Sequence, residues 1–130
     1  MAAEDRPQIY LISPAEIDLD TFPDQMARML DAVEIACIRL ALAAKDEDTI
    51  GRAADAVRAV AHERDVAVVI ETHFRMAERH GLDGVHLTDG AKSLRDARKL
   101  LGTDAIVGTF CGISRHDGMN AGEAGADYVA

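Results

Sequence analysis

One phrase occurs three times in the second half of this chain and constrains its fold more than any other feature. Gly81, Gly102 and Gly125 each begin a copy, so the copies start 21 and then 23 residues apart. In every copy an aspartate follows two positions later, and an apolar stretch comes directly after it. Each copy also follows a segment with helical spacing, where glycine favours the left-handed turn that ends a helix. The phrase therefore predicts a repeated helix, tight turn and strand.

The repeat predicts a parallel sheet with helical crossovers. Strands that alternate with helices at this spacing lie parallel, because each helix returns the chain to the same end of the sheet. The stretch 66–70 is apolar throughout, as is typical of a strand buried on both faces. The six expected strands, with a helix between each pair, are residues 9–13, 35–40, 66–70, 83–87, 105–110 and 127–130.

Three helix starts carry a capping-box pattern, in which a serine or threonine is followed three positions later by an acid. Such a residue accepts a hydrogen bond from a free backbone N–H of the first helical turn. We therefore expect helices to begin at these three places. The pairs are Thr21 with Asp24, Ser93 with Asp96, and Ser114 with Asp117.

Six strands and five helices predict an α/β fold of the (β/α)8 TIM-barrel type. Six strands cannot close a barrel, so residues 1–130 are expected to form a single domain that is the N-terminal portion of one, about six βα units. A leucine-rich solenoid is excluded because its leucine skeleton is missing. A dinucleotide-binding open sheet is disfavoured, because "SPAEID" at 13–18 stands where a glycine-rich phosphate turn would be.

Composition limits the classes of partner. The chain has 130 residues, 48% of them hydrophobic, which is ordinary for a globular domain. Its net charge of −9 argues against a nucleic-acid or membrane surface, because both attract basic proteins. No apolar run reaches the roughly 18 residues of a membrane span. Cys37 and Cys111 show no disulfide spacing, so reduced thiols and a cytoplasmic location are expected.

Several phrases resemble one enzyme family along nearly the whole chain. "IRLALAAK", "VVIETHFRMAERHGLDGVHL", "ARKLLGTDAIVG" and "GEAGADYVA" run in the order found in thiamine phosphate synthases and the related thiazole tautomerases. The strongest similarity lies in "GLDGVHL" and "GADYV". The resemblance implies a TIM-barrel transferase of thiamine biosynthesis. Such an enzyme couples a hydroxymethylpyrimidine diphosphate to a thiazole phosphate, with Mg²⁺ on the diphosphate.

The chain departs from that family where the resemblance implies chemistry. The family has Gln-Leu-Arg-x-Lys at the end of the second strand, so Ala41 and Ala43 replace the Arg and Lys that bind the diphosphate. "ET" at 71–72 replaces Asn-Asp, and "TDGA" at 88–91 replaces Gly-Gln-x-Asp. A divergent member is therefore expected. The alternatives are an enzyme acting on a thiazole or another phosphorylated heterocycle, or a non-catalytic binding or regulatory relative. The expected partners are small phosphorylated heterocycles, with a second copy of the chain in a homo-oligomer as a further candidate.

Glu71 and Asp89 are the candidate metal ligands. They fall at the ends of neighbouring strands, so both are expected at the barrel mouth, where two carboxylates and waters suit Mg²⁺. The alternative is that they are solvated acids or partners of Arg39. Arg39 itself lies in an apolar strand. Pointing inward it would meet Glu71, Asp89 or a ligand phosphate; pointing outward it would lie on the seam between helix and sheet.

The remaining site candidates lie near the carboxyl ends of the strands, where barrel enzymes place their chemistry. Thr72 and Thr88, together with Arg39, are the predicted substrate-binding residues, and His73 is the candidate acid or base. His86 lies inside the fourth strand, and two interpretations remain, a catalytic histidine or a packed, hydrogen-bonded one.

The three repeated aspartates lie at strand starts, at the opposite end of the barrel. That position argues against catalysis, so Asp83, Asp104 and Asp127 are assigned to hydrogen bonding in the turns.

Overall fold

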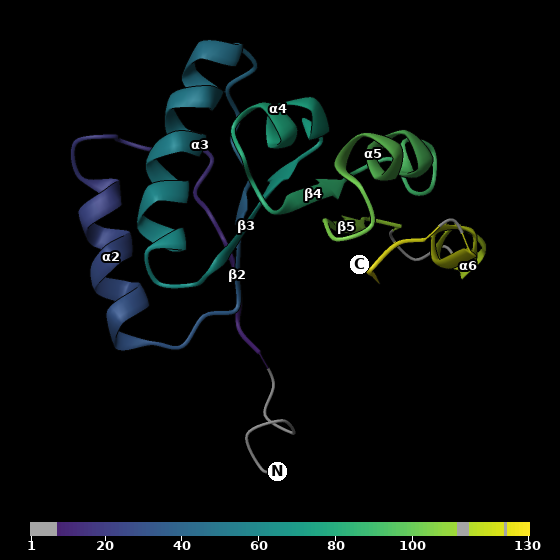
Figure 1. Cartoon of the computed structure of the whole chain (residues 1–130), viewed down its shortest axis with the longest axis horizontal. Helices are drawn as coiled ribbons and strands as arrows, with labels where there is room; N and C mark the ends of the chain where they lie inside the picture. Colours follow the sequence, from purple (N-terminus) through teal and green to yellow (C-terminus); the bar gives the residue numbers. More distant parts are fainter. Residues whose placement is uncertain (1–7, 112–114, 124) are drawn as a thin grey trace.

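The described residues form five βα units and a sixth strand, and all six strands are parallel (Figure 1). The computed structural model describes residues 8–111, 115–123 and 125–130. The sheet order β1-β2-β3-β4-β5-β6 follows the chain and confirms the expected barrel-type α/β fold. The strands are β1 Tyr10–Ile12, β2 Cys37–Leu40, β3 Ala67–Glu71, β4 Gly84–Leu87, β5 Ile106–Thr109 and β6 Tyr128–Val129. The helices are α2 Phe22–Ala32, α3 Glu47–His62, α4 Phe74–Arg79, α5 Leu94–Leu101 and α6 Arg115–Glu123.

The hydrophobic core lies between the sheet and the helices. Successive side chains of a strand point to opposite faces, so alternate residues of each strand meet the helices. Figure 1 shows the helices along the outside of the curved sheet, with α2 and α3 side by side. The strand residues of this core are Ile38, Leu40, Val68, Ile70, Val85, Leu87 and Val107.

No helix in the described part of the chain is long and apolar enough to cross a bilayer.

The opposite face of the sheet is concave. Tyr10 on β1 and Tyr128 on β6 are 118 residues apart, yet their hydroxyls hydrogen-bond and their ring centroids lie 5.7 Å apart. These strands are the two edges of the sheet. The contact therefore shows that the sheet curls like an arc of a barrel, with inner side chains from both edges meeting across the hollow.

The repeated glycines end helices as expected. Gly81, Gly102 and Gly125 have φ angles of 67°, 92° and 99°. Glycine adopts such positive φ angles without a steric cost, which residues with a side chain do not. Each repeat therefore turns the chain sharply from a helix into the next strand.

The repeated aspartates do not act inside their own turns, which corrects the expectation. The Asp83 carboxylate accepts a hydrogen bond from the backbone N–H of Val68 on β3, and the Asp127 carboxylate accepts one from Val107 on β5, both at 2.7 Å. Asp83 and Asp127 each lie just before a strand. Each carboxylate therefore accepts a backbone N–H of the adjacent strand that has no strand carbonyl opposite it. No side-chain hydrogen bond of Asp104 is seen among the described residues. Each of these two carboxylates also has a basic partner: His62 hydrogen-bonds Asp83 at 2.7 Å, and Arg98 donates to Asp127 at 2.9 Å.

Two of the predicted helix starts are confirmed, because Thr21 and Ser93 stand at helix N-caps. The predicted capping bonds are wrong, since neither side chain makes a capping hydrogen bond. Ser93 instead donates its hydroxyl to Asp89 at 2.6 Å. The side-chain cap lies at Asp46 before α3, which accepts the N–H three residues further on at 3.0 Å. Ser114, the third predicted cap, lies outside the described residues.

Candidate functional site

The concave face carries a polar group of side chains that we call the inner cluster: Tyr10, Arg39, Glu71, His86 and Tyr128. They come from β1, β2, β3, β4 and β6. In the strand register, Glu71 on β3 pairs with His86 on β4. His86 and Tyr128 both pair with Gly108, which lies between them on β5. Side chains at matched register on one face of a sheet lie side by side. The fold therefore gathers these five residues into one site.

Arg39 is the centre of the inner cluster. Its Nη1 lies 2.9 Å from Nε2 of His86, and its Nε lies 3.2 Å from a carboxylate oxygen of Glu71. That Nε is buried without a well-directed hydrogen bond, so the contact with Glu71 is an ion pair by proximity. The guanidinium also lies 5.6 Å from the centre of the Tyr10 ring, within the range of a cation–π contact. Arg39 thus points inward, as one of the two interpretations predicted, and its anion is Glu71.

The donor chemistry of arginine fixes the direction of the two hydrogen bonds of His86. A guanidinium only donates, so Nε2 of His86 accepts and the ring proton sits on Nδ1. Nδ1 lies 2.7 Å from the Tyr128 hydroxyl and donates to it. The Tyr128 hydroxyl also hydrogen-bonds the Tyr10 hydroxyl, and either oxygen can be the donor of that bond.

Burial favours the neutral forms of His86 and Tyr128. The pKa of His86 is lowered to about 4, first by burial and then by the nearby charge of Arg39. The pKa of Tyr128 is raised, chiefly by burial and then by its hydrogen bond with Tyr10. Burial also raises the pKa of the Cys37 thiol, on the same strand as Arg39, to about 11. At neutral pH the cluster therefore holds one cation, one carboxylate and neutral hydrogen-bonding groups.

Gly108 on β5 makes room for the contact between His86 and Tyr128. A Cβ at this position would lie 1.9 Å from the Tyr128 ring, which is far closer than atoms can approach. Because Gly108 has no Cβ, the rings of Tyr128 and His86 can stack, with centroids 5.6 Å apart and planes inclined by 20°. The absence of a side chain on β5 is therefore a requirement of the inner cluster.

The structure brings two of the predicted substrate-binding residues together. The hydroxyl oxygens of Thr72 and Thr88 lie 3.2 Å apart, directly after β3 and β4. Thr72 has a φ of 65°, an unusual left-handed conformation for a β-branched residue and one often found at functional sites. His73 follows as the N-cap residue of α4 and makes no capping hydrogen bond with its side chain. These residues form a polar rim at the carboxyl ends of the strands.

The two candidate metal ligands are not brought together by any contact. Glu71 lies against Arg39, and Asp89 accepts the hydroxyl of Ser93. Residues 8–111, 115–123 and 125–130 hold no group of three His, Cys, Asp or Glu side chains arranged to bind a metal. A site of two carboxylates completed by waters therefore stays a prediction.

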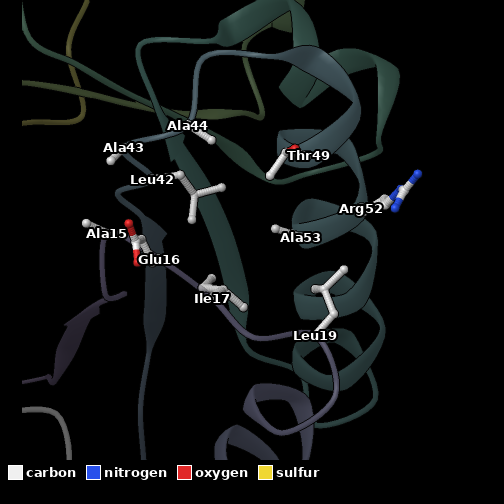
Figure 2. A pocket seen from close by; sticks show the side chains of 10 residues that line it. All are labelled: Ala15, Glu16, Ile17, Leu19, Leu42, Ala43, Ala44, Thr49, Arg52 and Ala53. Carbon is white, nitrogen blue, oxygen red and sulfur yellow. The ribbon is translucent and has the colours of Figure 1, made fainter.

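A cavity of about 470 Å³ was not predicted from the sequence (Figure 2). It is enclosed by the loop after β1, the loop after β2 and the first half of α3. The backbone N–H of Ala43 donates to Ala15 at 2.9 Å and holds the two loops together. Because the cavity depends on this loop packing, alanines in the sequence were its only local signal. The lining residues are Ala15, Glu16, Ile17, Leu19, Leu42, Ala43, Ala44, Thr49, Arg52 and Ala53.

Sequence comparison identifies the family. A family model described as thiamine monophosphate synthase matches residues 9–130. The chain belongs to this family. The thiamine-phosphate synthase of Rhodospirillum centenum is 43% identical over 123 residues, which are 95% of this chain and 59% of that protein. The thiamine-phosphate synthase of Hyphomonas neptunium is 39% identical over 130 residues, 96% of this chain and 59% of the relative. This member of the thiamine monophosphate synthase family thus spans about three fifths of their length.

Solved structures agree on the fold. A thiamine phosphate pyrophosphorylase from Pyrococcus furiosus superposes with a TM-score of 0.76 at 16% identity, covering 95% of this chain and 58% of the other. A structure described as "Native KDPGal structure" superposes with a TM-score of 0.58 at 15% identity, covering 98% of this chain and 58% of the other. At such low identity these likenesses show the architecture of the family member, an arc of a TIM barrel.

Proposed function

We propose that this protein binds phosphorylated thiamine precursors at the inner cluster and the Thr72–Thr88 rim. In the full proposal it couples a hydroxymethylpyrimidine diphosphate to a thiazole phosphate, with release of diphosphate. Family membership over residues 9–130 is the observation that carries this proposal. We also propose that residues 1–130 form a single domain, the N-terminal portion of one barrel.

The proposed roles follow from the contacts. The paired hydroxyls of Thr72 and Thr88 suit the oxygens of a phosphate group, because each can donate one hydrogen bond. Arg39 orients His86 and supplies positive charge beside the ligand through the guanidinium edge that meets neither His86 nor Glu71. His73, on the same rim, is the proposed acid or base.

Mg²⁺ belongs to this proposal as part of the substrate. A magnesium ion keeps several waters and is often held by substrate phosphates with one or two carboxylates. Asp89 is the better of the two candidate carboxylates, because Glu71 is neutralised by Arg39. We therefore propose that the ion arrives with the diphosphate and meets Asp89.

One observation favours a second candidate function, the binding of a phosphorylated heterocycle without turnover. The loop after β2 lacks cations at Ala41 and Ala43, and its backbone donors are also in use. The N–H of Ala41 donates to the Ser13 hydroxyl and that of Ala43 to the carbonyl of Ala15, both at 2.9 Å. This loop therefore offers a diphosphate neither charge nor free N–H groups at these positions.

A turnover assay distinguishes the two functions. The chain is mixed with both phosphorylated precursors, with and without Mg²⁺, and thiamine phosphate and diphosphate are measured. Mg²⁺-dependent formation of both supports the synthase. Saturable binding of the precursors, measured calorimetrically, with no product supports the binding protein, and conversion of the thiazole phosphate alone supports a tautomerase. No binding and no product would contradict the proposal.

A further inference from the structure

We propose that the cavity between the first two loops and α3 binds a small apolar-bodied cation whose charged end carries N–H donors, such as an amidinium or a protonated aminoheterocycle. The inference does not depend on the proposed thiamine chemistry. It rests on the volume of the cavity, its apolar walls and the kind of polar groups that line it.

The walls of the cavity suit an apolar body. A volume of about 470 Å³ lies within the range of about 300–1,000 Å³ that is common for small-molecule sites. Ile17 and Leu42 are half-buried in its wall, and Leu19 at its edge keeps 40% of its surface exposed. Covering exposed apolar surface with an apolar ligand removes it from water, which favours binding. Ala53 of α3 lies on the opposite wall, and its short side chain leaves the space open.

The polar groups that the cavity presents are acceptors. Glu16 has a carboxylate, and no ion pair or hydrogen bond of its side chain is seen within the described ranges. Thr49 donates its single hydroxyl proton to Asp46 at 2.6 Å, so its oxygen can only accept from a ligand. A ligand that meets both groups must bring donors, and a positive charge would complement the carboxylate.

The one cation in the lining is turned away. Figure 2 shows the Arg52 side chain pointing outward from α3, on the side opposite to Glu16. Its guanidinium pairs with Asp48, one helical turn earlier, at 2.9 Å. Because Arg52 is paired with Asp48, no unpaired cation among the lining residues faces the cavity. An anionic ligand would instead meet the carboxylate of Glu16 on the facing loop. The geometry therefore selects cations over anions.

Three probes with the same ring but different charge test this inference: benzamidine, benzamide and benzoate. Each is titrated into the ¹⁵N-labelled chain at one pH and ionic strength, and backbone amide shifts are followed. Benzamidine is expected to shift the amides of 15–19, 42–44 and 49–53. It should bind at least about tenfold more tightly than benzoate, because a hydrogen bond to a charged group contributes that much or more. Equal affinities, or shifts elsewhere in the chain, would overturn the proposal.

Variants separate the site from bulk charge. Glu16→Gln should remove most of the preference for benzamidine over benzamide, whereas Glu78→Gln, the same change on an exposed residue of α4, should leave it intact. Ala53→Leu should abolish benzamidine binding by filling the cavity, with the far-ultraviolet spectrum unchanged as a check on folding. If Glu78→Gln matches Glu16→Gln, or if benzamidine still binds the folded Ala53→Leu variant, the site is wrong.

Discussion

Arg39 donates from β2 to the ring of His86 on β4, across the intervening strand β3, with 2.9 Å between Nη1 and Nε2. This bond determines more than its own geometry. It places the ring proton of His86 on Nδ1, which donates to the Tyr128 hydroxyl, and that hydroxyl is hydrogen-bonded to Tyr10. Four strands of the sheet are thus linked by one chain of hydrogen bonds on the concave face.

Acidification should destabilise the protein through His86. Its pKa of about 4 in the folded state lies below the ordinary value of 6.5, so the unfolded chain binds the proton more tightly. Stability from this residue is complete above pH 6.5 and is lost as the pH falls towards 4, by up to about 3 kcal/mol. Urea unfolding at several pH values checks this. His86→Gln, which cannot titrate, should show a flatter profile over the same range, and identical slopes would refute the assignment.

Most of the fold was predictable because it depends on local signals. The repeated Gly81, Gly102 and Gly125 turns indicated the last three strands, and apolar runs indicated the first three; together they predicted six parallel strands. The helix caps were less predictable. A capping box is a pattern of a few residues, and Ser93 matched it, but its hydroxyl donates to the Asp89 carboxylate and its oxygen accepts no N–H of the first helical turn. The orientation of the side chain decided the outcome, and sequence spacing does not report it.

Gly108→Ala should disrupt the inner cluster. The added methyl group would lie 1.9 Å from the Tyr128 ring, so Tyr128 must move and its bond with His86 must break. Overpacking of this kind costs about 1–3 kcal/mol of the free energy of unfolding. The matched control is Gly122→Ala in α6, where a Cβ meets nothing within 4 Å. Thermal unfolding compares the two, and equal melting temperatures would show that the ring does not lie over Gly108.

Asp127→Ala should destabilise the link between β5 and β6. It leaves the buried N–H of Val107 without its acceptor and removes the partner of Arg98, a loss of about 1–3 kcal/mol. Asp104→Ala removes the equivalent residue of the middle repeat, which is exposed, and should change stability little. Chemical denaturation of both variants tests the difference. A comparable loss at Asp104 would mean that all three repeats work in the same way.

Cys37 should resist alkylation. Its thiol is buried and its pKa is raised to about 11, so little thiolate forms near neutral pH, and the thiolate is the reactive species. Iodoacetamide at pH 8 should therefore leave Cys37 unmodified in the folded chain and label it rapidly in urea, as read by mass spectrometry of the peptides. Fast labelling without denaturant would contradict the burial of this strand.

The candidate site was predicted in part. The inward ion pair of Arg39 with Glu71 was one of the two interpretations of the sequence, because a charge in an apolar strand needs a partner. The partner of His86 was not predicted. Tyr128 is 42 residues away, and its contact depends on the curvature of the sheet and on the missing side chain of Gly108. Such long-range conditions leave no local pattern in the sequence.

The ring nitrogens of His86 provide the most direct measurement. In a ¹⁵N-labelled sample at pH 7, two-bond ¹H–¹⁵N correlation spectra distinguish a protonated from an unprotonated nitrogen. The inner cluster predicts a neutral ring with the proton on Nδ1 and an unprotonated Nε2, a state that Arg39→Met should disturb. A proton on Nε2, or a charged ring at this pH, would show that Arg39 does not donate to His86.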